Sequence, residues 1–240
     1  MADYPILSNT PIKETIFTIS YSETIPVEIL KLFSQKEEIA KGYDSVIDGF
    51  STQVDVAEGQ ISSAKINPDG YILKCSKEDK IIQAREGSFS FHKVNRYEKF
   101  DVLLSELLVL WDVLVASYGQ KLSINNISLR YLNFIDYTEE KISELIKIVP
   151  TNPFTDDLKQ SFVHLSFNDK KYSKVDVNVF TAYPVNRDSK KCIVLDTILN
   201  QKQNDVNDYD LIKNDFMIMR EVKNYVFFTT ITEYTLNKYK

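Results

Sequence analysis

The sequence predicts an α+β protein, in which a sheet carries helices packed on one of its faces. Segments with alternating apolar residues outnumber segments with helical periodicity. The order strand, helix, three or four antiparallel strands and long helix also occurs twice along the 240 residues. We therefore expect a duplicated fold with one half at residues 1–120 and the other at residues 121–240, packed as one unit.

The first half begins with residues 11–21, where β-branched and polar residues alternate as in a strand. Pro26 then opens a helix that we expect to continue to residue 41, because proline is tolerated in the first helical turn. Antiparallel strands should follow as far as Val94. They are expected at residues 50–57, 62–67, 70–76 and 79–94.

Three turn signals separate these strands. They are Glu58-Gly59, Asn67-Pro68-Asp69-Gly70 and Lys77-Glu78-Asp79. The Pro-Asp-Gly sequence is the clearest hairpin signal in the chain, since proline and aspartate favour turns and glycine tolerates positive φ. It predicts a chain reversal at residues 67–70.

The strongest helical pattern covers residues 97–118, where apolar residues recur at steps of three and four. Gly119 follows directly and has the residue type that ends helices in the left-handed conformation. Trp111 lies inside the leucine stripe of this helix. We expect its ring to belong to the core instead of stacking on a cofactor.

The second half repeats this order. Residues 124–136 should form a strand and residues 139–148 a short helix. A long helix is expected over residues 208–235 with Asp208 as its N-cap, although the β-branched run 226–232 would also suit a strand. Between the helices we expect strands at residues 162–167, 174–183 and 191–199, with a turn at residues 186–189.

Composition limits the classes of function. A hydrophobic content of 43% is ample for a packed core, and the net charge of -5 with both signs interspersed gives no general attraction for nucleic acid. Cys75 and Cys192 lie in apolar strand patterns, which favours buried thiols, and two histidines give no zinc-binding spacing. We expect no cofactor and no metal. The chain lacks a signal-peptide pattern and a long apolar span, which predicts a soluble cytoplasmic protein without a membrane partner.

Sequence motifs of common enzymes are missing. The sequence contains no dinucleotide-binding or P-loop glycine pattern and no nucleophile elbow. His92 and His164 could act as an acid and base pair only if both faced one cleft, and we favour polar contacts for each. Glu14, Asp176 and Asp196 would form a metal-dependent nuclease site only on one shared face. These patterns favour a protein that is not an enzyme.

Two arginines lie in strongly apolar strands and need partners, because an unpaired buried charge is costly. We expect ion pairs between Arg85 and Glu14 and between Arg130 and Asp196. The alternative is that both guanidinium groups bind a carboxylate or phosphate at the junction of the halves.

Several motifs together resemble a sporadically distributed, uncharacterised prokaryotic family with no settled activity. They are Pro11-Ile12-Lys13-Glu14-Thr15-Ile16, Gln83-x-Arg85-x-Gly87-x-Phe89-x-Phe91, Leu129-Arg130-Tyr131-x-Asn133, Val194-Leu195-Asp196 and Phe228-x-x-x-Ile231-Thr232. The resemblance covers the whole chain and implies a fold but no chemistry. Phe134 departs from it, since the family often has arginine there. Patchy occurrence in microbes is typical of defence or toxin-associated genes.

We expect a non-enzymatic binding or regulatory module that acts through a protein partner at the sheet face or the junction of the halves. Homo-oligomers are not excluded. The candidate binding residues are Arg85, Arg130, Tyr131, Asn133, Phe89, Phe91 and His92.

Two alternatives remain open. In the first, the protein binds or processes RNA: Phe89, Phe91 and Tyr131 would stack bases. The phosphates would then be bound by Lys93, Arg96 and Arg130. In the second, the protein is a small-molecule sensor with a pocket between the helix at residues 97–118 and its sheet.

Overall fold

The computed structural model describes residues 4–57, 60–150, 160–187 and 190–240. The first half contains β1 (Ile12–Tyr21), α1 (Val27–Ser34), α2 (Glu37–Ala40), β2 (Ser45–Ala57), β3 (Gln60–Cys75), β4 (Lys80–Arg85), β5 (Ser88–Val94) and α3 (Phe100–Tyr118). The second half contains β6 (Ile124–Asp136), α4 (Ile142–Leu145), β7 (Ser161–Asn168), β8 (Asp176–Arg187), β9 (Lys190–Val206), α5 (Tyr209–Thr230) and α6 (Glu233–Tyr239).

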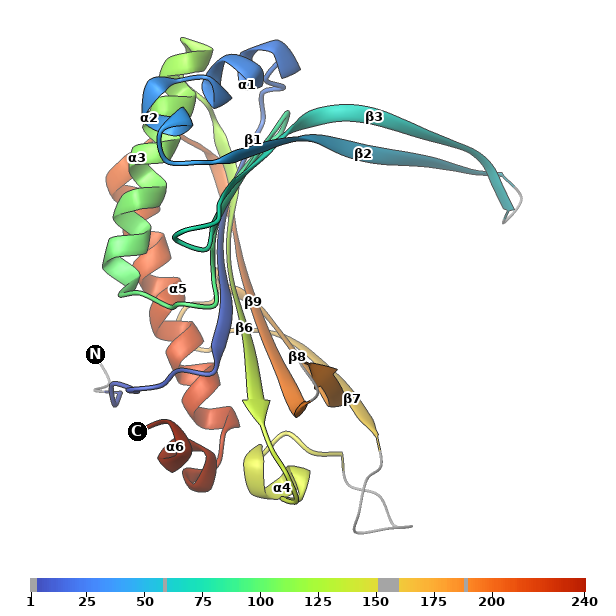
Figure 1. The fold of residues 1–240 in the computed structure, drawn as a ribbon, viewed down its shortest axis with the longest axis vertical. Coiled ribbons are helices and arrows are strands. Elements are labelled where there is room, and N and C mark those ends of the chain that lie inside the picture. Colours follow the sequence, from blue (N-terminus) through green and yellow to red (C-terminus); the bar gives the residue numbers. More distant parts are fainter. Residues whose placement is uncertain (1–3, 58–59, 151–159, 188–189) are drawn as a thin grey trace.

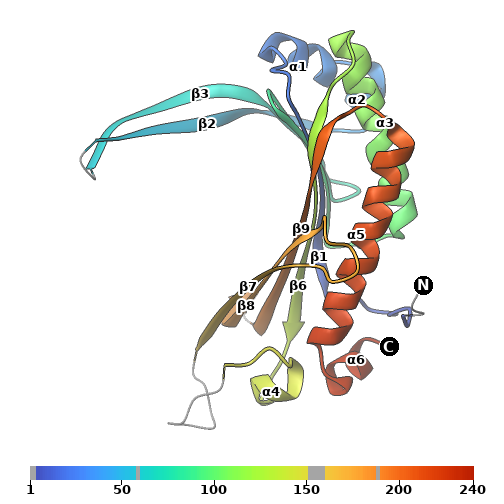
Figure 2. The same cartoon turned by 180° about the vertical axis from the view of Figure 1, so that it is seen from behind.

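The strands of the described residues form one nine-stranded antiparallel sheet with the order β2-β3-β4-β5-β1-β6-β9-β8-β7. The long helices α3 and α5 lie side by side against one face of it (Figures 1 and 2). This confirms the predicted α+β class with helices on one face. No helix within the described ranges is long and apolar enough to cross a membrane.

The first strand of each half lies at the centre of the sheet. β1 pairs with β5 on one side and with β6 on the other, so the sheet runs from one half into the next without a break. The hairpin of β2 and β3 extends away from the body as an arm, and β7 and β8 bend toward the same side (Figure 1). The sheet is therefore curved, with its concave side turned away from α3 and α5.

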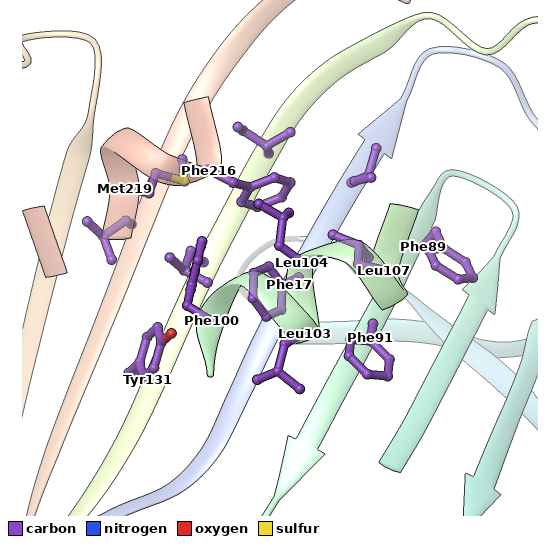
Figure 3. Close-up of a cluster of buried hydrophobic side chains, with 14 of the residues drawn as sticks. Phe17, Phe89, Phe91, Phe100, Leu103, Leu104, Leu107, Tyr131, Phe216 and Met219 are labelled. Carbon is purple, nitrogen blue, oxygen red and sulfur yellow. The ribbon is translucent and has the colours of Figure 1, made fainter. Parts of the chain in front are cut away.

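The core lies between the sheet and the long helices, and it joins the two halves (Figure 3). The ring of Phe17 on β1 lies 5.4 Å from Phe100 on α3 and 5.5 Å from Phe216 on α5, measured between ring centroids. All three side chains are buried. Trp111 is also buried, as its place in the leucine stripe predicted.

The hairpin predicted at residues 67–70 was wrong, because these residues lie inside the continuous strand β3. They form a bulge opposite β2, where the register shifts between Gly49 and Phe50. Gly70 has a φ of 152°, and a Cβ there would lie 2.0 Å from the carbonyl oxygen of Ala84. The glycine of this turn-like sequence therefore allows the backbones of β3 and β4 to lie close together instead of forming a chain reversal.

The strand predicted over residues 79–94 is in fact two strands, β4 and β5, joined by a turn at Glu86 and Gly87. The predicted turn at Glu58-Gly59 lies outside the described residues, as do the last two residues of the turn expected at 186–189.

Helix ends follow local signals closely. Gly119 caps α3 with a φ of 77°, and the Asp208 side chain accepts backbone N–H bonds from Asp210 and Leu211 at the start of α5, both as predicted. The helix predicted over residues 208–235 ends earlier, because Ile231 forms a β-bridge with Ile146. The chain then continues as α6.

Candidate functional site on the helix-free face

The concave face of the sheet, called here the helix-free face, carries the side chains that point away from α3 and α5. Strand register places Ile81, His92, Ile16, Arg130 and Ile198 in one row across β4, β5, β1, β6 and β9. A second row contains Val94, Glu14, Leu132, Asp196 and Phe180. Charged and apolar side chains therefore alternate across the middle of this face.

Arg130 and Asp196 form a two-point ion pair across β6 and β9. The Nε atom of Arg130 lies 2.9 Å from Oδ1 of Asp196, and Nη2 lies 2.6 Å from Oδ2. The carboxylate side is only 10% exposed, whereas the arginine side chain is 41% exposed. The predicted pair is present, and it holds the guanidinium plane in one orientation.

Glu14 and His92 form the neighbouring pair, with 2.8 Å between Oε1 of Glu14 and Nδ1 of His92. The hydrogen bond from His92 lowers the pKa of the Glu14 carboxyl group, and the positive charge of Arg130 acts in the same direction against the effect of burial. The two pairs are thus electrostatically connected through Glu14 and Arg130. They form the charged centre of the helix-free face.

The pair predicted between Arg85 and Glu14 does not form. Arg85 instead donates from Nη1 to both carboxylate oxygens of Asp69, at 2.6 Å and 2.7 Å. Asp69 lies in the β3 bulge next to Gly70, and the backbone N–H of Glu86 donates to its carbonyl oxygen. The bulge therefore supplies the partner that the sequence pattern could not reveal.

Four of the predicted binding residues face the helices instead of the helix-free face. Phe89, Phe91 and Tyr131 are fully buried, and Asn133 is 2% exposed. Strand alternation explains this, because these residues lie one position out of phase with His92 and Arg130. The aromatic rings expected to stack RNA bases are therefore covered by α3 and α5.

Lys93 and Arg96 do not extend this face either. Lys93 is buried and pairs with Glu98 at 2.7 Å, and Arg96 is exposed in the loop after β5. His164 lies near the far edge of the sheet, where its ring stacks on Phe180 at 4.1 Å. Four strands separate β7 from β5 in the sheet order, so His164 and His92 do not form an acid and base pair.

Small polar side chains on this face were missed by the sequence analysis. The hydroxyl groups of Thr18 and Ser90 lie 2.9 Å apart, and strand register places Ser128 and Asn200 in the same row. Period-two alternation from Glu14 and Arg130 would have assigned Thr18 and Ser128 to this face. Which residues lie beside them, Ser90 and Asn200, can be known only from the strand register of the structure.

Among the described residues there is no cluster of three or more His, Cys, Asp or Glu side chains that could hold a metal ion. The space beside α3 expected for a small-molecule sensor is a cavity of about 170 Å³, bordered by Trp111, Leu122 and Tyr209. Ligand pockets usually exceed about 300 Å³.

Neither a comparison with protein-family models nor a comparison with curated proteins gives a match. The resemblance to an uncharacterised prokaryotic family therefore stays a prediction.

Arg130→Met should lower the free energy of unfolding by about 2–3 kcal/mol, because the mostly buried Asp196 carboxylate loses its charged partner. The partial exposure of Arg130 keeps the cost below that of a fully buried pair. Arg130→Lys should lose less, since a lysine keeps the charge but not the planar fork. Urea denaturation measures the free energy of unfolding of both variants.

The matched control is Arg96→Met. Arg96 is 81% exposed and lies 3.9 Å from Asp79, so its replacement should change stability by less than about 0.5 kcal/mol. A wild-type urea midpoint for Arg130→Met would show that the pair with Asp196 does not stabilise the fold.

Proposed function

We propose that the protein is a binding module that takes a protein partner on the helix-free face. The observation that carries the proposal is Arg130, which is oriented by Asp196 and yet partly exposed among Ile16, Leu132 and Ile198. An arginine held in place costs little further entropy on binding, and arginine is enriched at the centres of protein interfaces.

The surroundings of Arg130 support a protein partner over a nucleic acid. Arg85 and Arg130 each donate two hydrogen bonds to a carboxylate, Asp69 or Asp196, so their charges are largely neutralised. A phosphate backbone would have to compete with these carboxylates. A partner peptide could instead add its carbonyl groups to Arg130 and its apolar side chains to the neighbouring isoleucines and leucine.

The experiment is purification of the tagged protein from its native host, followed by mass spectrometry and by absorbance at nucleic-acid and protein wavelengths. Ser128→Arg introduces a bulky charge on the helix-free face, next to Thr18 and Asn200. We expect a protein to copurify with the wild type and its yield to fall at least about tenfold with Ser128→Arg, as for loss of an interface centre.

Ser105→Arg is the matched control, because Ser105 is exposed on α3 on the other side of the sheet. It should retain the partner, and both variants should melt near the wild-type temperature. If Ser128→Arg proves unstable, Asn200→Arg tests the same row of the face. A partner retained by every folded face variant, or nucleic acid in place of protein, would contradict the proposal.

A further inference from the structure

A groove of about 930 Å³ runs along α5 on the opposite side of the sheet from the helix-free face. One wall is the outer part of the sheet, where β7 and β8 contribute apolar side chains, and the other wall is α5 itself. The apolar side chains that line the two walls include Leu165, Phe167, Val179, Val222, Tyr225 and Val226. Leu165 and Phe167 on β7 are 40% and 42% exposed, whereas Val179 on β8 is buried, so the open part of this wall is on β7.

One end of the groove is fixed by the connection between β7 and β8, which folds toward α5 (Figure 2). The Tyr172 hydroxyl group donates to Oε2 of Glu221 at 2.8 Å. Asp169 holds this connection in shape, because its carboxylate accepts backbone N–H bonds from Lys171 and Tyr172. The groove therefore has a built end and is not a gap between loosely placed elements.

The first half of the protein shows what fills the corresponding place there. Its connection between β1 and β2 contains α1, which packs on β3 and β4 beside α3. Leu30 and Phe33 of α1 are fully buried, and the Phe33 ring packs edge-on against Phe89 at 5.9 Å. An amphipathic helix of eight residues thus covers the outer strands of the first half.

The second half has no such cover among its described residues. Counted outward in the sheet from the central strands β1 and β6, β8 corresponds to β4 and β7 to β3, and α5 corresponds to α3 as the long helix after the strands. The corresponding helix α4 has only four residues and packs against α6, and none of its residues lines the groove. The β8 residues Val177 and Val179 are buried, whereas the β7 residues Leu165 and Phe167 stay partly exposed without a helix over them.

We propose that this groove receives an amphipathic helix of a partner protein, in the position that α1 has in the first half. The helix would present large apolar side chains three and four residues apart, as Leu30 and Ile29 are from Phe33 in α1. The groove lies on the far side of the sheet from Arg130, so this interaction is separate from the one on the helix-free face.

Charge adds a preference to this spacing. Lys170 is exposed at the fixed end of the groove, and the exposed Lys171 beside it has its Nζ atom 3.7 Å from Oε2 of Glu221. The nearby acids are already engaged, Asp169 by backbone N–H groups and Glu221 by Tyr172 and Lys171. A helix with acidic residues beside its apolar stripe would therefore fit better than a basic one.

The test uses a phage-displayed library of 18-residue helices with fixed Leu, Ile, Val or Phe at positions i, i+3 and i+7 and all other positions random. The full-length protein is the target. We expect enriched peptides with acidic flanks, whose affinity is then measured by fluorescence anisotropy. Leu165→Lys on the groove wall should weaken binding at least about tenfold, as for loss of a central apolar contact.

Val109→Lys is the matched control, because Val109 is 63% exposed on α3 and lies outside the groove. It should bind the enriched peptides like the wild type. Absence of enrichment would overturn the proposal, and so would equal binding by Leu165→Lys. Competition by a synthetic peptide of residues 149–160 would assign the groove to the chain itself and would also overturn it. Ser128→Arg should leave peptide binding unchanged, so the two proposed interactions fail independently.

Discussion

Trp111→Ala is expected to lower the free energy of unfolding by about 3–5 kcal/mol, as truncation of a buried aromatic side chain does. Trp111 is 2% exposed, and its ring packs against Tyr21 at 5.6 Å and against Phe89 at 6.0 Å. The change would leave a cavity between α3 and the sheet that the surrounding rings cannot fill. Urea denaturation followed by circular dichroism measures the loss.

Val109→Ala is the control for this prediction. It removes apolar atoms from the same helix at a position that is 63% exposed, so stability should change by less than about 0.5 kcal/mol. A Trp111→Ala protein that unfolds at the wild-type denaturant concentration would show that the tryptophan ring does not pack in the core.

Lys223 is a cation placed on the buried side of α5. Its Nζ atom lies 4.2 Å above the centroid of the Tyr131 ring, which is fully buried between β6 and the helices. Tyr97 and Arg220 lie close by, since the Tyr97 hydroxyl is 3.4 Å from that of Tyr131 and Arg220 pairs with Asp101 at 3.3 Å. Burial and the positive charge of Arg220 lower the pKa of Lys223 to about 7.

Lys223→Met should therefore stabilise the protein at neutral pH. A shift from 10.5 to about 7 corresponds to at most about 5 kcal/mol between the two protonation states. The contact with the Tyr131 ring stabilises the charged form of Lys223 and offsets about 0.5–2 kcal/mol of this difference. Because the Lys223 side chain is partly accessible to solvent, the net gain should be smaller than this difference, about 2–3 kcal/mol at pH 7 or below.

The dependence on pH identifies the cause. Between pH 7 and pH 10.5 the unfolded chain holds a proton on Lys223 that the folded protein has released, so the wild-type stability should rise with pH in this window. The buried phenols of Tyr97 and Tyr131 have raised pKa values and affect stability only above pH 10. Lys223→Met should remove most of the rise between pH 7 and pH 10.

Lys213→Met is the control, because Lys213 is exposed on the other side of α5 and its replacement changes the net charge equally. Its stability should follow the wild-type pH profile. If the stability of Lys223→Met depends on pH as that of the wild type does, the ammonium group of Lys223 reaches solvent in the folded protein.

Local signals in the sequence determined much of the secondary structure. The strand over Ile124–Asp136, the left-handed cap at Gly119 and the N-cap at Asp208 each depend on residues within a few positions of one another. The same is true of alternation, which places Phe89 and Phe91 on one face of β5 and His92 on the other. Such features need no knowledge of the rest of the chain.

Tertiary structure decided which face of each strand is covered and which charges meet. Alternation places Phe89 and His92 on opposite faces of β5, but only the positions of the helices show which of these two faces they cover. Arg85 and Glu14 each need a charged or polar partner, and the local sequence pattern does not identify which residue that partner is. The choice depends on strand register and on the bulge at Gly70, which brings Asp69 to Arg85 and leaves Glu14 to His92. Pairing between distant segments sets much of that register, because β1 pairs with β5 and with β6, which both lie far along the chain from it.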